Sequence, residues 1–231
     1  MFKEPWKLQT RAGAAGAPRE AGPSSPSRTA HAGSAQNSVC SRHSNGLEQF
    51  FGYIQGERGL NILDLSGASQ ANIGFITNLG HKLYAEDLLQ TLDTAFGGGD
   101  FFLNQSSPER IERFLRHSLD FPENHFNGAL VWDLLEYLSP PLLKATVDRL
   151  ARIVKPRSYL LAIFHAEERA ELVSTYSYRI ADAGTLLLSL RGMRKPAQLF
   201  NNRAVEKLFQ AFESVKFFLT RDHLREVVVK R

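Results

Sequence analysis

The chain has 231 residues and a formal net charge of +4, a length that suits one domain with an appendage. Residues 1–46 hold six basic and two acidic side chains, so the net charge lies in this segment and residues 47–231 are formally neutral. A neutral folded part argues against a specific nucleic-acid surface, which requires clustered positive charge. The single cysteine, Cys40, excludes a disulfide framework and a thiolate metal site within one chain.

The first 46 residues are rich in Ala, Gly, Ser, Pro and Arg and show no hydrophobic periodicity. Such a composition buries too little apolar surface to offset the entropy lost on ordering. We therefore predict a disordered basic tail over residues 1–46 and one folded domain over residues 47–231. No apolar run reaches the length of a membrane span, no secretory signal is evident, and the histidines lack metal-ligand spacing. We expect a cytoplasmic protein without a resident metal.

Strand and helix patterns alternate through the folded part, which favours a mainly parallel α/β sheet covered by helices on both faces. The first half is predicted to contain a strand from residue 61, a helix over 73–79, a strand over 82–85, a helix over 88–95, a short strand over 101–103 and a helix from a cap at Ser106 to about residue 116. The second half is predicted to contain a strand over 128–132, a helix over 139–153, a strand over 159–164, a hairpin of strands over 174–180 and 185–190, a helix over 202–212, and antiparallel strands over 215–219 and 225–230.

The most informative stretch is the turn that follows the first strand. It contains the small residues Ser66, Gly67 and Ala68, and the next strand ends in the acids Glu86 and Asp87. This order is typical of the opening unit of a parallel sheet that holds a nucleoside-bearing cofactor, because small residues let the backbone approach the ligand and an acid about twenty residues on can accept the ribose hydroxyls. Only one glycine lies in the turn, so the spacing is not that of a dinucleotide fingerprint.

Six short motifs follow one another along the folded part, at residues 63–69, 80–88, 121–127, 134–138, 152–156 and 225–230. In this order and spacing they resemble the class I S-adenosylmethionine-dependent methyltransferases of the broad small-molecule type, over about residues 60–231. The resemblance implies a Rossmann-like, seven-stranded, mainly parallel sheet with an antiparallel last strand. It also implies S-adenosyl-L-methionine as cofactor and methyl transfer to a small-molecule acceptor.

The resemblance also assigns site residues. The cofactor-binding residues that it implies are Asp64, Ser66, Gly67 and Ala68 around the methionyl end, Asp87 or its neighbour Glu86 at the ribose, and Trp132 and Asp133 at the end of the fourth strand. Trp132 could lie along the adenine or the substrate, or could belong to the core.

Methyl transfer from a sulfonium is an in-line displacement, so the protein mainly aligns the reactants and sometimes removes a proton. His165 is the candidate base, because it ends the fifth strand and ligands bind beyond the carboxyl ends of such strands. A solvated loop histidine is the alternative. Tyr176 and Tyr178 project from one face of the predicted hairpin, where we expect cross-strand packing rather than a substrate pocket.

Two other functions stay open. The turn carries Ser66 and Ala68 where the family usually has glycine, and the acid that often contacts adenine is missing before Leu119. These departures keep open a non-catalytic methyltransferase-like domain that serves a partner protein. A nicotinamide oxidoreductase is disfavoured by the glycine spacing and by the closing antiparallel strands.

Overall fold

The computed structural model describes residues 39–220 and 223–231, so residues 1–38 of the predicted tail lie outside the described residues. The last part of that predicted tail is folded. Val39–His43 forms strand β1, and Asn45–Ile54 forms helix α1, which is capped by the Ser44 hydroxyl. The folded part therefore begins earlier than residue 47.

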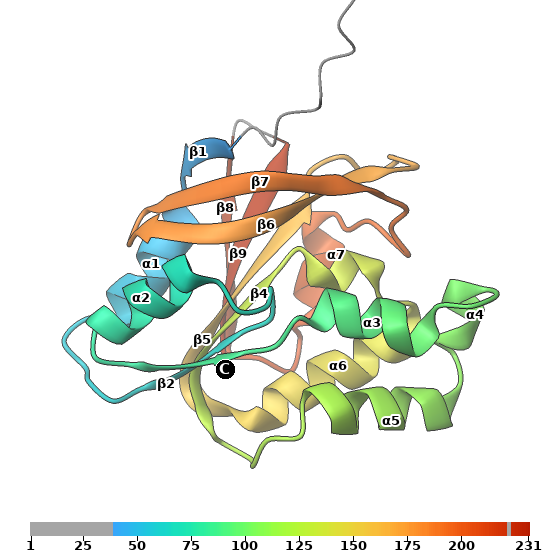
Figure 1. Cartoon of the computed structure of the whole chain (residues 1–231), viewed down its shortest axis with the longest axis horizontal. Coiled ribbons are helices and arrows are strands. Elements are labelled where there is room, and N and C mark those ends of the chain that lie inside the picture. The colour runs from blue at the N-terminus through green and yellow to red at the C-terminus, as the bar shows by residue number, and fades with distance from the viewer. Residues whose placement is uncertain (1–38, 221–222) are drawn as a thin grey trace, which may run out of the picture. The chain divides into compact units, whose positions relative to one another are not determined.

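The main sheet has the strand order β3-β2-β4-β5-β9-β8 (Figure 1). Its strands are β2 (Asn61–Asp64), β3 (Lys82–Ala85), β4 (Phe126–Trp132), β5 (Val154–His165), β8 (Ser214–Leu219) and β9 (Leu224–Lys230). Neighbours from β3 to β5 are parallel, whereas β9 runs antiparallel to both β5 and β8. The mostly parallel sheet and the antiparallel last strand match the prediction.

The predicted count of seven strands is wrong for the residues that the structure describes, where the main sheet has six. The predicted strand over residues 101–103 is instead part of helix α4 (Phe101–Asn104). The carboxylate of Asp100 accepts hydrogen bonds from the backbone N–H groups of Phe102 and Leu103, which starts a helical turn at this point.

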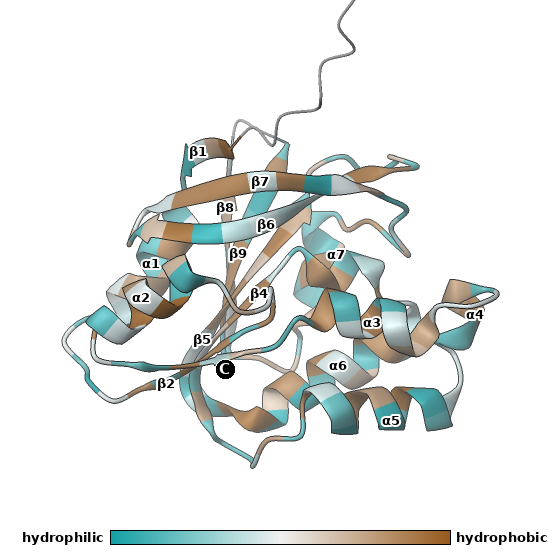
Figure 2. Cartoon of the chain, viewed as in Figure 1, coloured by the Kyte–Doolittle hydropathy of each residue, from teal (hydrophilic) through white to brown (hydrophobic). Residues whose placement is uncertain are grey.

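Helices cover both faces of the sheet because the strands bury apolar side chains on each side (Figure 2). On one face lie α3 (Leu88–Phe96), α5 (Pro108–Ser118), α6 (Pro140–Ile153) and α7 (Asn202–Leu208). On the other lie α1 and α2 (Gln70–Asn78). Alternate residues of β4 serve the two cores: Ala129 and Val131 face the first group of helices, and Leu130 and Trp132 face the second.

The predicted hairpin is confirmed and is longer than expected. Strands β6 (Val173–Asp182) and β7 (Thr185–Arg194) pair antiparallel, and β1 adds a third strand along β7. Its inner face buries Tyr178, Ile180, Leu186 and Leu188 in the core that α1 and α2 share. Figure 1 shows this second sheet lying across the main one.

A buried ion pair joins β1 to the main sheet. The guanidinium of Arg42 lies 2.5 Å from one carboxylate oxygen of Glu226 in β9, and the backbone N–H of Gly46 donates to the other oxygen at 2.7 Å. Both charged side chains are buried. The start of the folded part is thus fixed to the last strand.

Candidate functional site

The turn after β2 is organised around the buried carboxylate of Asp64. One oxygen accepts from the backbone N–H of Ser66 (3.0 Å), from the Ser66 hydroxyl (2.8 Å) and from Nε1 of Trp132 (2.7 Å). The other oxygen accepts from Nδ2 of Asn72 at 2.7 Å. Three of the four donors converge on one oxygen, and all four belong to the protein. Asp64 therefore shapes the turn.

Gly67 and Asp87 lie against each other at the carboxyl ends of β2 and β3. Gly67 has φ +90°, and a Cβ at this position would lie 3.1 Å from the Cβ of Asp87, so only glycine suits the turn. One oxygen of Asp87 caps α3 by accepting from the backbone N–H of Gln90 at 2.9 Å. The other lies 3.7 Å from the guanidinium of Arg191, and the Asp87 side chain remains 28% exposed. The Asp87 side chain is thus only partly enclosed by the protein.

Ala68 follows Gly67 in the sequence, and Glu86 precedes Asp87. Ala68 is exposed and Glu86 is half-buried. Burial raises the pKa of Glu86, and the charge of His117 offsets part of that increase.

Trp132 fills the space between the carboxyl ends of β2 and β4. It is buried, has φ +57° and stacks on Tyr178 of the hairpin, with ring centroids 4.8 Å apart and planes 9° from parallel. A bulky residue in the left-handed region costs about 1–3 kcal/mol and persists only where its surroundings hold it. Here the hydrogen bond to Asp64 and the stack with Tyr178 do so. The structure places Trp132 in the core beneath the hairpin.

Asp133 follows Trp132 and is also buried. The Tyr137 hydroxyl donates to its carboxylate at 3.3 Å, and the Tyr178 hydroxyl faces it. Burial raises the pKa of Asp133 to about 6, although the charge of His165 opposes that increase. An acid with this pKa changes protonation near neutral pH.

His165 ends β5 and has both ring nitrogens engaged. Nδ1 lies 2.5 Å from Oε2 of Glu136, and Nε2 lies 3.1 Å from the carbonyl oxygen of Ser174 in β6. The backbone N–H of His165 also donates to Oε1 of Glu136. The Ser174 carbonyl only accepts, so Nε2 carries a proton, and a second proton is shared between Nδ1 and Oε2 of Glu136. Burial alone would lower the pKa of His165, but the hydrogen bond and charge of Glu136 outweigh it and raise that pKa.

Sequence reasoning missed two residues of this site. Glu136 lies in the 3-10 helix η1 (Leu134–Tyr137) that follows β4, and Asn72 lies in α2. Glu136 lies within the motif at residues 134–138, to which no role was assigned, and Asn72 has no local signal. Asn72 nevertheless links the turn to the hairpin: Nδ2 donates to Asp64 and to the Tyr178 carbonyl, and Oδ1 accepts from the backbone N–H of Ile180.

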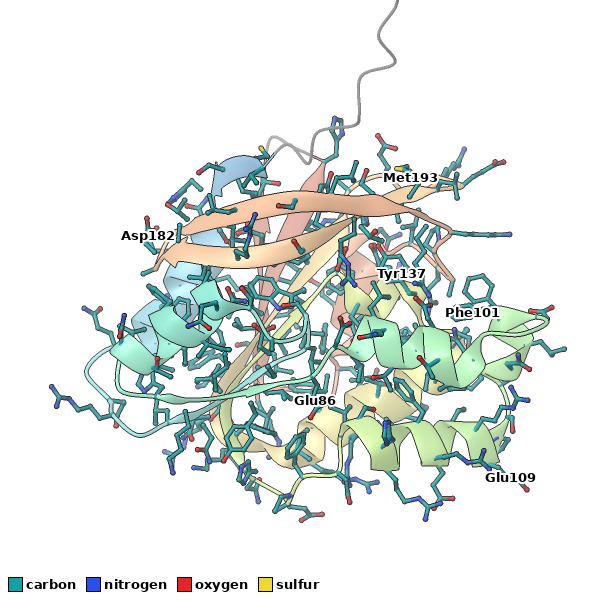
Figure 3. The ribbon with its side chains drawn as sticks, in the orientation of Figure 1. Glu86, Phe101, Glu109, Tyr137, Asp182 and Met193 are labelled. Carbon is teal, nitrogen blue, oxygen red and sulfur yellow. The ribbon has the colours of Figure 1, made fainter. Side chains whose placement is uncertain are left out.

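The hairpin contacts the site from one end to the other. Tyr178 covers Trp132 and faces Asp133, the Ser174 carbonyl accepts from His165, and Arg191 approaches Asp87. In Figure 3, Asp182 and Met193 mark the two ends of the hairpin, and Tyr137 lies below it. The structure thus brings the predicted residues to one edge of the sheet and covers that edge.

A cavity of about 260 Å³ opens beside His165 at the edge of the hairpin. Ser174, Tyr176, Met193 and His223 are among its lining residues. Tyr176 lines this cavity and also packs edge to face on Tyr178, so it fits both readings that the sequence left open, whereas Tyr178 packs on Trp132.

Within residues 39–220 and 223–231, no group of three or more His, Cys, Asp or Glu side chains is arranged to hold a metal ion. No helix in the same ranges is long and apolar enough to cross a membrane.

The chain is similar to solved structures of S-adenosylmethionine-dependent methyltransferases, whereas no family model and no curated protein matches its sequence. The 1,6-didemethyltoxoflavin-N1-methyltransferase of Burkholderia thailandensis, crystallised with 1,6-didemethyltoxoflavin and S-adenosylhomocysteine, is 12% identical (80% of this chain, 76% of that chain, TM-score 0.43). A methyltransferase of Methanosarcina mazei is 15% identical (78% and 95%, TM-score 0.45). One from Aquifex aeolicus is 15% identical (79% and 88%, TM-score 0.40). Similarity at this level does not by itself assign a cofactor or an activity to this chain.

Proposed function

We propose that this chain binds S-adenosylmethionine at the carboxyl ends of β2, β3 and β4 and transfers its methyl group to a small molecule. The order β3-β2-β4 places the strands that follow β2 on opposite sides of it. Such a switch opens a crevice outside the carboxyl ends, where ligands of open α/β sheets bind. The observation that carries the proposal is the partly exposed side chain of Asp87 beside the Gly67 backbone at this edge.

The residues present fit one end of the cofactor. Asp87 would accept a hydrogen bond from a ribose hydroxyl, and Gly67 allows the close approach. At the methionyl end, the Asp64 carboxylate already accepts from four donors of the protein, and the stacked rings of Trp132 and Tyr178 lie beside it. We infer that the described arrangement is closed and that the β6–β7 hairpin shifts when the cofactor binds, since a ligand selects the state that has room for it.

The cofactor, when bound, supplies an activated methyl group, so the remaining tasks are alignment and proton removal. His165 is poorly placed to act as a base, because both of its ring nitrogens already have hydrogen-bond partners within the protein. Asp133 is better suited, because its pKa of about 6 allows it to take a proton near neutral pH. We assign the acceptor to the cavity beside His165, which Tyr176 lines.

A second function, a non-catalytic methyltransferase-like domain, is favoured by one observation. The contacts of the hairpin with Asn72 and Trp132 are those of a packed core, and they fill the methionyl end. In this case the edge would be permanently covered.

Calorimetric titration of the full chain with S-adenosylmethionine, S-adenosylhomocysteine and NAD tests the proposal. We expect the first two ligands to bind and NAD to leave the signal unchanged. Binding of NAD alone would overturn the assignment. Binding of none of the three would favour the non-catalytic domain.

A further inference from the structure

A groove between α3 and α5 lies on the helical face of the sheet that bears the larger core. Its volume is about 490 Å³, within the range of small-molecule sites. The residues that line it are Gln90, Thr91, Thr94 and Ala95 of α3, with Arg110, Arg113, Phe114 and His117 of α5. None of the proposed methyl-transfer residues belongs to it.

The charge of the groove comes from one face of α5. Arg110, Arg113 and His117 are spaced by three and four residues, so they lie along the same side of the helix. Figure 2 shows α5 as largely hydrophilic, and the buried side chain of Phe114 forms the apolar floor. No acidic side chain lines the groove, and the described residues provide no ion pair to Arg110 or Arg113.

Acidic groups lie at the margins of this groove. Glu112 forms an ion pair with Arg116 at 3.6 Å, and both line the separate groove between α5 and α6. Glu109 lies at the start of α5, and Glu86 lies close enough to His117 to sense its charge (Figure 3). The charged side chains in the middle of the groove are therefore all basic, so this part of the groove presents only positive charge to a ligand.

The charged hydrogen-bonding groups that line the groove are donors. The two guanidinium groups have donors and no acceptor. The hydroxyls of Thr91 and Thr94 donate to the backbone carbonyls of Asp87 and Gln90, so each hydroxyl offers only acceptor lone pairs to a ligand. A ligand that satisfies the two guanidinium groups must be rich in acceptors and negatively charged.

We propose that the groove between α3 and α5 binds the phosphate group of a small phosphorylated molecule. A phosphomonoester carries about two negative charges and three acceptor oxygens, which suits two forked guanidinium groups and a neighbouring imidazole. The groove is larger than one phosphate, so the remainder of the molecule lies over Phe114. This site is independent of the proposed methyl transfer.

Calorimetry of the full chain with ribose 5-phosphate, ribose and inorganic phosphate tests the inference. We expect ribose 5-phosphate to bind, ribose to give no signal, and phosphate to bind more weakly and to compete. The double variant Arg110→Gln/Arg113→Gln should lose at least about tenfold in affinity, because each lost charge-assisted pair removes about that much. His117→Asn should lose less.

Arg116→Gln is the matched control, since it removes the same charge from the same helix outside the groove. We expect the affinity of this control to stay within about twofold of the parent, which is small beside the roughly tenfold loss expected for one charge-assisted pair. All four substituted positions are exposed, and thermal unfolding of each variant verifies its fold. An equal loss in Arg116→Gln, an unchanged affinity in the double variant, or no binding of ribose 5-phosphate would each overturn the proposal.

Discussion

The carboxylate of Asp87 combines a structural contact with a proposed binding contact, and two substitutions separate them. Asn is as good a helix cap as Asp, whereas Ala removes the bond to Gln90 and costs about 1 kcal/mol in the free energy of unfolding. Removal of the charged acceptor weakens a ribose contact by about 1.5–3 kcal/mol. We expect both Asp87→Asn and Asp87→Ala to bind S-adenosylhomocysteine at least about tenfold more weakly, and only Asp87→Ala to be destabilised.

Glu86→Ala serves as the control for this pair, because Glu86 is the alternative ribose ligand. We expect a small change in affinity. If Glu86→Ala abolishes binding and the Asp87 variants bind normally, the ribose contact belongs to Glu86. If no variant loses affinity in a chain that binds the cofactor, the site assignment fails.

Asp133 predicts a pH dependence of stability with a definite sign. Its pKa is about 6 in the folded state and about 4 when unfolded, so the folded state binds more protons between these values. Its contribution to stability is therefore present below pH 4 and decreases by up to about 3 kcal/mol as the pH rises to 6. The pKa of His165 is also raised, so its contribution to stability is lost at higher pH, above the ordinary pKa of histidine.

Urea unfolding of the parent and of Asp133→Asn at pH 4.5 and pH 7 measures this contribution. We expect the parent to lose stability relative to the variant as the pH rises. Parallel pH profiles for the two proteins would show that Asp133 is not held with a raised pKa.

At the scale of elements, the hairpin is held over the site by Asn72. Asn72→Ala removes the bonds to Ile180 and Tyr178 and leaves a buried N–H without a partner, at a cost of about 1–3 kcal/mol. We expect faster amide hydrogen exchange along β6, while β4 keeps its protection.

Asn104→Ala is the matched control for Asn72→Ala. The Asn104 amide also bonds two backbone carbonyls, those of Phe96 and Gly98, at a distance from the hairpin. Exchange along β6 should not change in this variant. Equal acceleration in both variants, or none in Asn72→Ala, would show that Asn72 does not hold the hairpin closed.

The elements that sequence patterns predicted well are those whose cause is local or periodic. The buried strands β4 and β5 and the helix α6 follow from continuous apolar runs and from the proline-containing start after Ser139. β1 could not be found in this way, because four of its five residues are exposed and its strand conformation depends on pairing with β7. For α4, the apolar run of residues 101–103 favours a strand, but the hydrogen bonds that Asp100 accepts from the backbone N–H groups of Phe102 and Leu103 stabilise a helical turn.

The candidate site divides along the same line. Gly67 and Asp87 were predictable because a turn that needs positive φ and an acid after the next strand are features of the chain itself. The other contacts of the site join residues that are distant in the sequence. Trp132 donates to Asp64, His165 bonds the Ser174 carbonyl, and Tyr178 stacks on Trp132. Only the assembled fold shows that the predicted edge is covered.

At the scale of the whole molecule, the boundary of the folded part is a testable feature. We expect deletion of residues 1–38 to leave the free energy of unfolding unchanged, because their composition provides little apolar surface. Deletion of residues 1–46 removes β1 and leaves the buried carboxylate of Glu226 without Arg42, which costs about 3–5 kcal/mol. Thermal unfolding of both truncated chains provides the comparison. Equal stability of the two would place the boundary at residue 47 after all.

Hydrogen exchange of the full chain with and without S-adenosylhomocysteine tests the central claim most directly, because it reports both where the ligand binds and whether the hairpin moves. The account predicts slower exchange in the turn over residues 64–69 and in the first turn of α3, together with altered exchange along β6. Unchanged exchange at the turn and at α3, or protection confined to other elements such as α5, would contradict it.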